Sequence, residues 1–233
     1  METGVRITVV KLGLLYDDSR VVREGTGGAD AWFGMATSAR DMINVAWLYQ
    51  QGKGVPKDCG KAREWFDRAA HFGNAVAMRE LGLLYQNGEG VLQDWGKALE
   101  WFEKAATIGD ILSMTSLGLL YQNGEGVPQD NGKAREWYQR AAQSGDPIAM
   151  TNLAVLYFYG KGGRQDYAKA LAWFEEAANA GNTNAMFNLG LMYRDGRYVT
   201  QDYQRARDWF ERAADAGNAD AKEAFENLRS IPR

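Results

Sequence analysis

The chain has 233 residues, of which 45% are hydrophobic and 24% charged, a composition typical of a folded domain with ample apolar surface to bury. Its formal net charge of −3 lacks the excess of Lys and Arg found in nucleic-acid-binding proteins, so DNA and RNA partners are not expected. The sequence contains no apolar run of about 18 residues, so no membrane span is predicted. The single cysteine, Cys59, excludes an internal disulfide.

One residue pattern returns along the chain at intervals of 36 residues. It consists of a tyrosine and, further on, a pair of adjacent aromatic residues. The tyrosines are Tyr49, Tyr85, Tyr121, Tyr157 and Tyr193, and the pairs are Trp65-Phe66, Trp101-Phe102, Trp137-Tyr138, Trp173-Phe174 and Trp209-Phe210. Self-similarity at a period in this range predicts an array of stacked copies of one small unit.

The first predicted element is a degenerate repeat over residues 5–38, in which Tyr16 and Trp32 echo the pattern with a shortened offset. The segment from Met1 to Tyr16 does not resemble a signal peptide, because Lys11 interrupts its apolar stretch. A lone cysteine also suits a reducing compartment. We therefore expect a cytoplasmic protein, with a periplasmic or secreted location as the alternative if the natural start lies upstream.

Five full repeats follow over residues 39–218, and the unit at 74–109 illustrates them. Asn74, directly after Gly73, is a residue type that caps the start of a helix, and helical spacing of apolar residues then predicts a helix from about Ala75 to Gln86. Gly82 lies inside this helix, where glycine costs about 0.5–1 kcal/mol relative to alanine. Because glycine returns at this position in two other repeats, we expect a neighbouring helix to pass too close for a side chain.

The second half of each unit is predicted to be a glycine-containing turn and a second helix. Gly88 and Gly90 belong to the turn, and Asp94 is predicted to cap the second helix. The aromatic pair Trp101-Phe102 lies on the apolar side of that helix, where burying a large aromatic side chain contributes about 1.5–3 kcal/mol. After the fifth repeat, residues 219–229 are predicted to form a terminal capping helix, since Glu226 occupies a position held elsewhere by glycine or alanine.

These features resemble the Sel1-like repeat family, a relative of the tetratricopeptide repeats. The residues that carry the resemblance are Ala77-Met78, Leu81-Gly82, Leu84-Tyr85, Gly88, Gly90-Val91, Asp94, Lys97-Ala98, Trp101-Phe102, Ala105-Ala106 and Gly109. The resemblance implies an all-α fold in which residues 1–233 form a single solenoid domain. It would be a right-handed α–α superhelix of about five full helix pairs, the degenerate first unit and the capping helix. It also implies an adaptor role, in which the repeats bind other proteins.

Motifs that carry catalytic or cofactor chemistry are not found in the sequence. The Gly-x-Gly of each turn lacks the rest of a phosphate-binding motif and connects two helices, so a turn role is favoured. His71 is the only histidine, and no serine-nucleophile motif is present. A cysteine-rich branch of the family that this chain resembles is associated with penicillin-binding or hydrolytic activity. This chain has only Cys59 and so departs from that branch. We therefore expect no enzyme activity, cofactor or metal.

The resemblance to tetratricopeptide-like arrays implies that the first helix of each repeat lines a concave wall, where a protein or peptide ligand would bind. Four columns of residues share this helical face. The candidate partner-binding residues are Trp47, Gln50, Arg79, Leu83, Gln86, Asn87, Thr115, Leu119, Gln122, Asn123, Thr151, Val155, Phe158, Tyr159, Phe187, Leu191 and Arg194. Together they predict an apolar stripe beside a ladder of carboxamides.

Two interpretations of these columns stay open. The apolar residues also suit packing between repeats, and the Gln-Asn pairs also suit the end of a helix. The pair Phe158-Tyr159 favours a binding surface, because the two preceding repeats have Gln-Asn there, although the altered turn at 160–163 offers a local explanation. The favoured function is a non-enzymatic adaptor, with a hydrolase like those of the cysteine-rich branch and a structural spacer as alternatives.

Overall fold

The computed structural model describes residues 38–229, and the secondary structure in this range consists of eleven α-helices with no strand. The all-α fold predicted from the repeat is therefore confirmed. The predicted degenerate repeat at 5–38 lies outside the described residues, apart from its last position.

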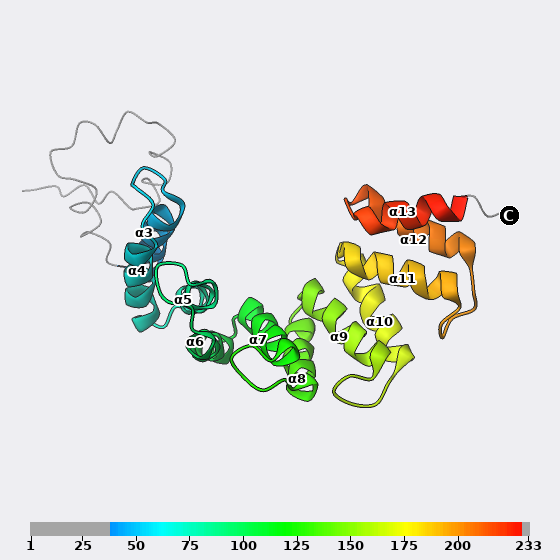
Figure 1. The fold of residues 1–233 in the computed structure, drawn as a ribbon, viewed down its shortest axis with the longest axis horizontal. Coiled ribbons are helices and arrows are strands. Elements are labelled where there is room, and N and C mark those ends of the chain that lie inside the picture. The colour runs from blue at the N-terminus through cyan, green and yellow to red at the C-terminus, as the bar shows by residue number, and fades with distance from the viewer. Residues whose placement is uncertain (1–37, 230–233) are drawn as a thin grey trace, which may run out of the picture. The chain divides into compact units, whose positions relative to one another are not determined.

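The helices alternate between the two types that the repeat predicts (Figure 1). The first helices of the repeats are α3 (Ala39–Gln51), α5 (Ala75–Asn87), α7 (Ile111–Asn123), α9 (Pro147–Tyr159) and α11 (Thr183–Asp195). The second helices are α4 (Cys59–His71), α6 (Trp95–Thr107), α8 (Asn131–Gln143), α10 (Tyr167–Asn179) and α12 (Tyr203–Asp215). The last helix, α13 (Ala219–Arg229), has the bounds expected for the terminal helix.

The residues predicted to start and stop the helices do so. Asn74 accepts a hydrogen bond from the backbone N–H of Ala77 at 3.1 Å, and Asp94 accepts one from the N–H of Lys97 at 2.9 Å. Both bonds satisfy N–H groups that have no partner within their own helix. Gly88 ends α5 with φ of 70°, in the left-handed conformation that glycine adopts without steric cost.

Packing follows chain order within two compact units, residues 1–113 and 114–233, whose division falls inside α7. In the described part of the first unit, α3 packs on α4, α4 on α5 and α5 on α6. In the second unit, each helix from α8 to α12 packs on its successor, and α13 completes the series on α12. Each unit is therefore built from contacts between helices that are neighbours in the sequence, as expected for stacked repeats.

The aromatic pair of each repeat divides into a buried and a half-exposed residue. The second member is buried in every described repeat: Phe66, Phe102, Tyr138, Phe174 and Phe210. The first member is half-buried, and in four repeats a basic side chain three residues later lies over its ring, as Lys104 lies 4.2 Å from the Trp101 centroid. The second aromatic column thus forms the core, and the tryptophans shield its edge with help from cation–π contacts.

The glycine inside the first helix faces this buried ring. An ideal Cβ on Gly82 would lie 2.6 Å from the Phe102 ring, and one on Gly118 would lie 2.4 Å from the Tyr138 ring. Close approach of the neighbouring helix was predicted, and the structure identifies the neighbouring atoms as the aromatic ring of the second helix in the same repeat. The glycine therefore makes room for the largest side chain of the core.

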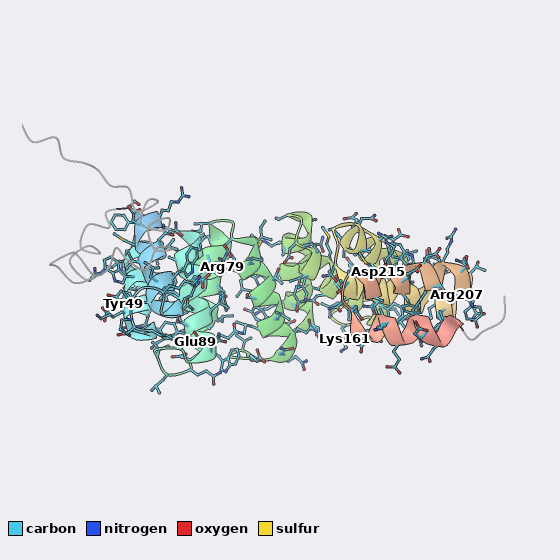
Figure 2. The ribbon with its side chains drawn as sticks, turned by 90° about the horizontal axis from the view of Figure 1, so that it is seen from above. Tyr49, Arg79, Glu89, Lys161, Arg207 and Asp215 are labelled. Carbon is cyan, nitrogen blue, oxygen red and sulfur yellow. The ribbon has the colours of Figure 1, made fainter. Side chains whose placement is uncertain are left out.

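The terminal helix α13 is attached to α12 through its apolar side and its end. Ala221 and Leu228 are buried, and the guanidinium of Arg207 on α12, which Figure 2 labels, donates to the Leu228 carbonyl oxygen at 2.7 Å. Glu226 on α13 is exposed, as the sequence predicted for this position. A membrane-spanning candidate, meaning a helix of sufficient length and hydropathy, is not found within residues 38–229.

Candidate partner-binding site

The first column of predicted binding residues makes contacts that connect successive repeats. Arg79, labelled in Figure 2, forms an ion pair with Asp110 at 2.9 Å and a second with Glu80 at 3.2 Å. Asp110 also accepts from the backbone N–H of Ser113 at the start of α7, so the pair fixes α5 to the start of the next repeat. The side chains of Arg79 and Asp110 are only 18% and 9% exposed, so little of the Arg79 surface is available to a ligand.

The same column in the second unit is also engaged in packing. Thr115 and Thr151 are buried, with Thr115 donating to the Asp146 carboxylate and Thr151 donating to the Pro147 carbonyl oxygen at 2.8 Å. Phe187 is half-buried and its ring lies 5.6 Å from that of Phe210. These contacts favour the structural interpretation of this column over a binding role.

The predicted carboxamide ladder is partly committed to the protein itself. The Gln122 amide oxygen accepts from the Tyr138 hydroxyl at 2.8 Å, and the half-buried Gln50 and Gln86 stand in the same column. The exposed amides of the neighbouring column donate to glutamates of the turns, Asn87 to Glu89 and Asn123 to Glu125, both at 3.4 Å. The ladder as a recognition element for a peptide backbone stays a prediction.

The apolar column is partly accessible. Trp47, Leu83, Val155 and Leu191 are half-buried and Leu119 is 40% exposed. Trp47 packs against the buried core of the first unit, so at that position the packing interpretation accounts for part of the side chain. Whether the columns of both units form one wall stays a prediction.

One part of the second unit brings several predicted residues together around a cavity of about 240 Å³. Val155, Phe158 and Tyr159 contribute from α9, and Leu191 and Arg194 from α11. Phe158 is 9% exposed and Tyr159 is 61% exposed, and their rings meet edge to face at 5.0 Å. We call this cavity the apolar pocket. It is smaller than the roughly 300–1,000 Å³ of small-molecule sites, so its size suits one large side chain.

The mouth of the apolar pocket is charged. Asp195 pairs with Arg194 at 2.7 Å and with Arg197 at 3.6 Å, and Arg197 lies 5.8 Å from the centre of the Phe158 ring. Lys161, in the turn after α9 (Figure 2), lies 6.0 Å from the Tyr159 ring. Three cationic side chains and one carboxylate therefore lie beside the Phe158 and Tyr159 rings. The guanidinium groups are held there by ion pairing with Asp195 and, for Arg197, by contact with an aromatic ring.

Three residues near this pocket were missed by the sequence interpretation: Tyr167, Arg197 and Tyr198. Tyr167 is the first residue of α10, and its ring lies 5.1 Å from that of Phe158. Tyr198 follows in the turn after α11 and stacks on Tyr167 at 6.3 Å. A signal was available, because Gly196-Arg197-Tyr198 replaces the Gly-x-Gly of the other turns.

Catalytic or metal-binding arrangements are not apparent within residues 38–229, where no group of three His, Cys, Asp or Glu side chains converges. Cys59 is a free, half-buried thiol at the start of α4. His71 is exposed at the end of α4, and its Nδ1 donates to the Asp67 carbonyl oxygen at 2.7 Å. Burial raises the pKa of the Tyr138 hydroxyl, so this phenol stays protonated and acts as a hydrogen-bond donor in the core.

The paired helices, the 36-residue period and the residues that cap each helix define a helical repeat protein. The chain belongs to the Sel1 repeat family, whose family model matches residues 39–73, 75–110, 111–146, 147–182 and 183–218. Proteins of this family are generally protein-interaction scaffolds, and their fold is typically non-catalytic. Comparison with curated proteins gave no match.

Solved structures of similar fold support this assignment. A Sel1 repeat protein from Oxalobacter formigenes is 31% identical with a TM-score of 0.83, over 97% of this chain and 91% of that one. The c5321 protective antigen of uropathogenic Escherichia coli is 30% identical with a TM-score of 0.82, over 96% of this chain, which spans only 48% of the antigen. The immunity protein PA5088 from Pseudomonas aeruginosa shares the fold at 23% identity and a TM-score of 0.52, covering 79% of this chain and 67% of its own.

Proposed function

We propose that this chain is a non-enzymatic interaction scaffold that binds an extended segment of a protein partner, with the apolar pocket between α9 and α11 as the main contact. The observation that carries the proposal is the replacement of Gln-Asn by Phe158-Tyr159 at a place where these positions line a cavity with Val155 and Leu191. Large aromatic side chains in a pocket are enriched among the residues that dominate binding energy.

The altered turn at 160–163 does not account for this replacement. Gln165 donates to the Phe158 carbonyl oxygen at 2.6 Å, as Gln129 donates to that of Gln122 at 2.8 Å in the preceding repeat. The hydrogen bond from the glutamine side chain that closes the turn is therefore the same in both repeats, although residues 158 and 122 differ. The unusual residue of the turn is Gly163, and the space beside it is occupied by the Arg135 guanidinium rather than by Phe158.

The exposure of Tyr159 also supports a binding role. Burial would explain an aromatic residue by packing, but this ring is 61% exposed at the edge of the pocket. The exposed ring beside the cavity is available for contact with a partner. No observation on the described residues favours a hydrolase, since Asp195, the carboxylate at the pocket, is held by two guanidinium groups. A spacer role would leave the pocket without an occupant.

The test is affinity capture from a native lysate with the full chain and two variants. The double variant Phe158→Gln, Tyr159→Asn restores the residues of the two preceding repeats, and Leu92→Ala removes a 91% exposed side chain in the first unit as a matched control. We expect a partner that the wild type and Leu92→Ala retain and the double variant loses. Because Phe158 is buried, the double variant should also have a lower thermal midpoint, so capture is compared at a temperature at which all three proteins are folded.

A photo-crosslinking phenylalanine derivative in place of Tyr159 then establishes whether the captured protein touches the pocket. Crosslinks to that protein support the proposal. Equal capture by the double variant, or crosslinks only from a probe placed at Leu92, would refute it.

A further inference from the structure

Four aromatic rings form an unbroken series of contacts across the last two repeats. Tyr159 meets Phe158 at 5.0 Å, Phe158 meets Tyr167 at 5.1 Å, and Tyr167 stacks on Tyr198 at 6.3 Å. We call these four residues the aromatic series. It begins at the apolar pocket and ends at a second, more open cavity, which Tyr167 and Tyr198 line together with Arg135, Arg164 and Lys169. The two cavities are therefore connected by aromatic side chains.

Tyr198 is held in an unfavourable backbone conformation to complete this series. Its φ is 68°, and within residues 38–229 it is the one non-glycine residue with a positive φ. The equivalent residues of the other turns are Gly54, Gly90, Gly126 and Gly162, with φ between 71° and 74°. A side chain of this size in the left-handed region is an outlier, and such outliers concentrate at functional sites.

Packing does not explain the tyrosine. The Tyr198 side chain is 59% exposed and lies against Tyr167, itself a half-buried residue. In two other repeats an ideal Cβ at this position would come within 2.4 Å of the backbone at the start of the preceding second helix, so glycine is the residue that fits best there. The aromatic ring is present although the turn favours glycine at this position, and its exposed side favours a role in binding a ligand.

The surroundings of the aromatic series are strongly basic in a chain whose net charge is −3. Six cationic side chains line the two cavities or lie over the rings: Arg135, Lys161, Arg164, Lys169, Arg194 and Arg197. Only two carboxylates stand among these lining residues. Asp195 pairs with Arg194 and Arg197, and Asp166 pairs with Lys169 at 3.3 Å. The local excess of positive charge complements an anionic ligand.

We propose that the aromatic series and its cations recognise an acidic, extended segment of a protein partner that carries one bulky apolar side chain. The apolar side chain enters the apolar pocket, and the flanking carboxylates lie beside Arg197 and Arg164 as the segment follows the series toward Tyr198. This inference rests on the proposed function, which it deepens by giving the chemistry of the partner and extending the site beyond the first helices.

An acidic peptide fits these features better than a single-stranded nucleic acid, although rings and cations also serve nucleic acids. Val155, Leu191 and Met192 give the apolar pocket a contact surface for one apolar side chain, beside the polar lining residues Asn188 and Asp195. The chain has no general excess of Lys and Arg, with a net charge of −3, so the cations are confined to this region and suit a short acidic segment better than a long phosphate backbone.

The experiment selects peptides from a random dodecapeptide display library on the immobilised full chain and measures their binding by fluorescence polarisation. Two variants restore residues that other repeats already have. Tyr198→Gly restores the glycine of the other turns, and Arg197→Glu restores the residue found at Glu89 and Glu125. Leu92→Ala is the control, and a single-stranded DNA of 12 thymidines is the competing probe.

We expect enriched peptides with net negative charge around a Trp, Phe, Tyr or Leu. Their affinity should fall at least about tenfold in each of the two variants, stay unchanged in Leu92→Ala, and weaken as salt is added because the contacts are ionic. Neutral or basic enriched peptides would overturn the proposed chemistry. Acidic peptides that bind both variants as tightly as the wild type would overturn the proposed site, leaving the scaffold function standing.

Two further results reach beyond this inference. Tighter binding of the DNA probe than of any peptide would overturn the peptide assignment in favour of a nucleic acid. A selection that enriches no peptide at all would overturn both this inference and the proposed function. Failure of this inference alone would instead show as enriched peptides that bind the two variants as tightly as the wild type.

Discussion

The left-handed conformation of Tyr198 predicts that glycine is a better substitute there than alanine, the reverse of the usual order. A non-glycine residue in this conformation costs about 1–2 kcal/mol, which glycine does not incur. Glycine in turn gives up about 0.4–1 kcal/mol through its greater freedom in the unfolded chain. Both variants lose the stack on Tyr167, so that loss cancels between them. The Tyr198→Gly protein should therefore be more stable than Tyr198→Ala by about 1 kcal/mol.

Thermal unfolding followed by circular dichroism measures the difference. In a chain of this size, 1 kcal/mol corresponds to about 2–4 °C in the melting midpoint, which the method resolves. Glu100, an exposed residue within α6, provides the matched control, because its backbone is helical and alanine should be the more stabilising substitute there. An alanine variant at Tyr198 that melts at or above the glycine variant would show that the residue carries no left-handed strain.

Three further predictions concern packing, ion pairing and pH. Gly118→Ala should destabilise the protein by about 1–3 kcal/mol in urea unfolding because its Cβ overlaps the Tyr138 ring, and Gly118→Leu should cost more; a midpoint for either variant equal to that of the wild type would contradict the packing. Arg79→Ala should cost about 2 kcal/mol because it leaves the Asp110 carboxylate nearly buried without its guanidinium, and an unchanged unfolding curve would show that the pair does not connect the repeats. The pKa of Asp166 is lowered, chiefly by the hydrogen bond from the Lys169 backbone, so the ionised carboxylate stabilises the fold above the ordinary Asp pKa and this stabilisation is lost as pH falls through the folded pKa. The stability of Asp166→Asn should therefore differ from that of the wild type at neutral pH and converge with it in acid. An NMR titration that gives the Asp166 carboxyl a pKa at or above the ordinary value would contradict this.

The helices and their ends could be predicted from the sequence because local chemistry determines them. Asp94 and Gly88 act on N–H and C=O groups within one turn of helix, so their effect follows from spacing alone. The regular interval of the aromatic pairs likewise predicted which residues form the core. It did not predict that the tryptophan of each pair stays half-buried, or that in four repeats a basic side chain lies over its ring, because burial depends on contacts with neighbouring helices.

The candidate site could be predicted only in part, because it combines residues of different repeats. Phe158 and Tyr159 were identified by their departure from the Gln-Asn of two other repeats, and the structure places them at a cavity. Thr115 was assigned to the same surface but is buried against Asp146, a partner 31 residues away that no helical face reveals. Tyr198 was missed because the turn was interpreted as a repeated glycine turn, although the substitution itself was visible in the sequence.

The most direct test of the proposed partner surface is an NMR spectrum of the full chain bound to an acidic peptide selected on it. The bulky side chain of the peptide should give nuclear Overhauser effects to the methyl groups of Val155 and Leu191 and to the rings of Phe158 and Tyr159, which line the apolar pocket. Effects to methyl groups of the first unit, such as those of Leu83, with none to these four residues, would place the ligand elsewhere and contradict the account.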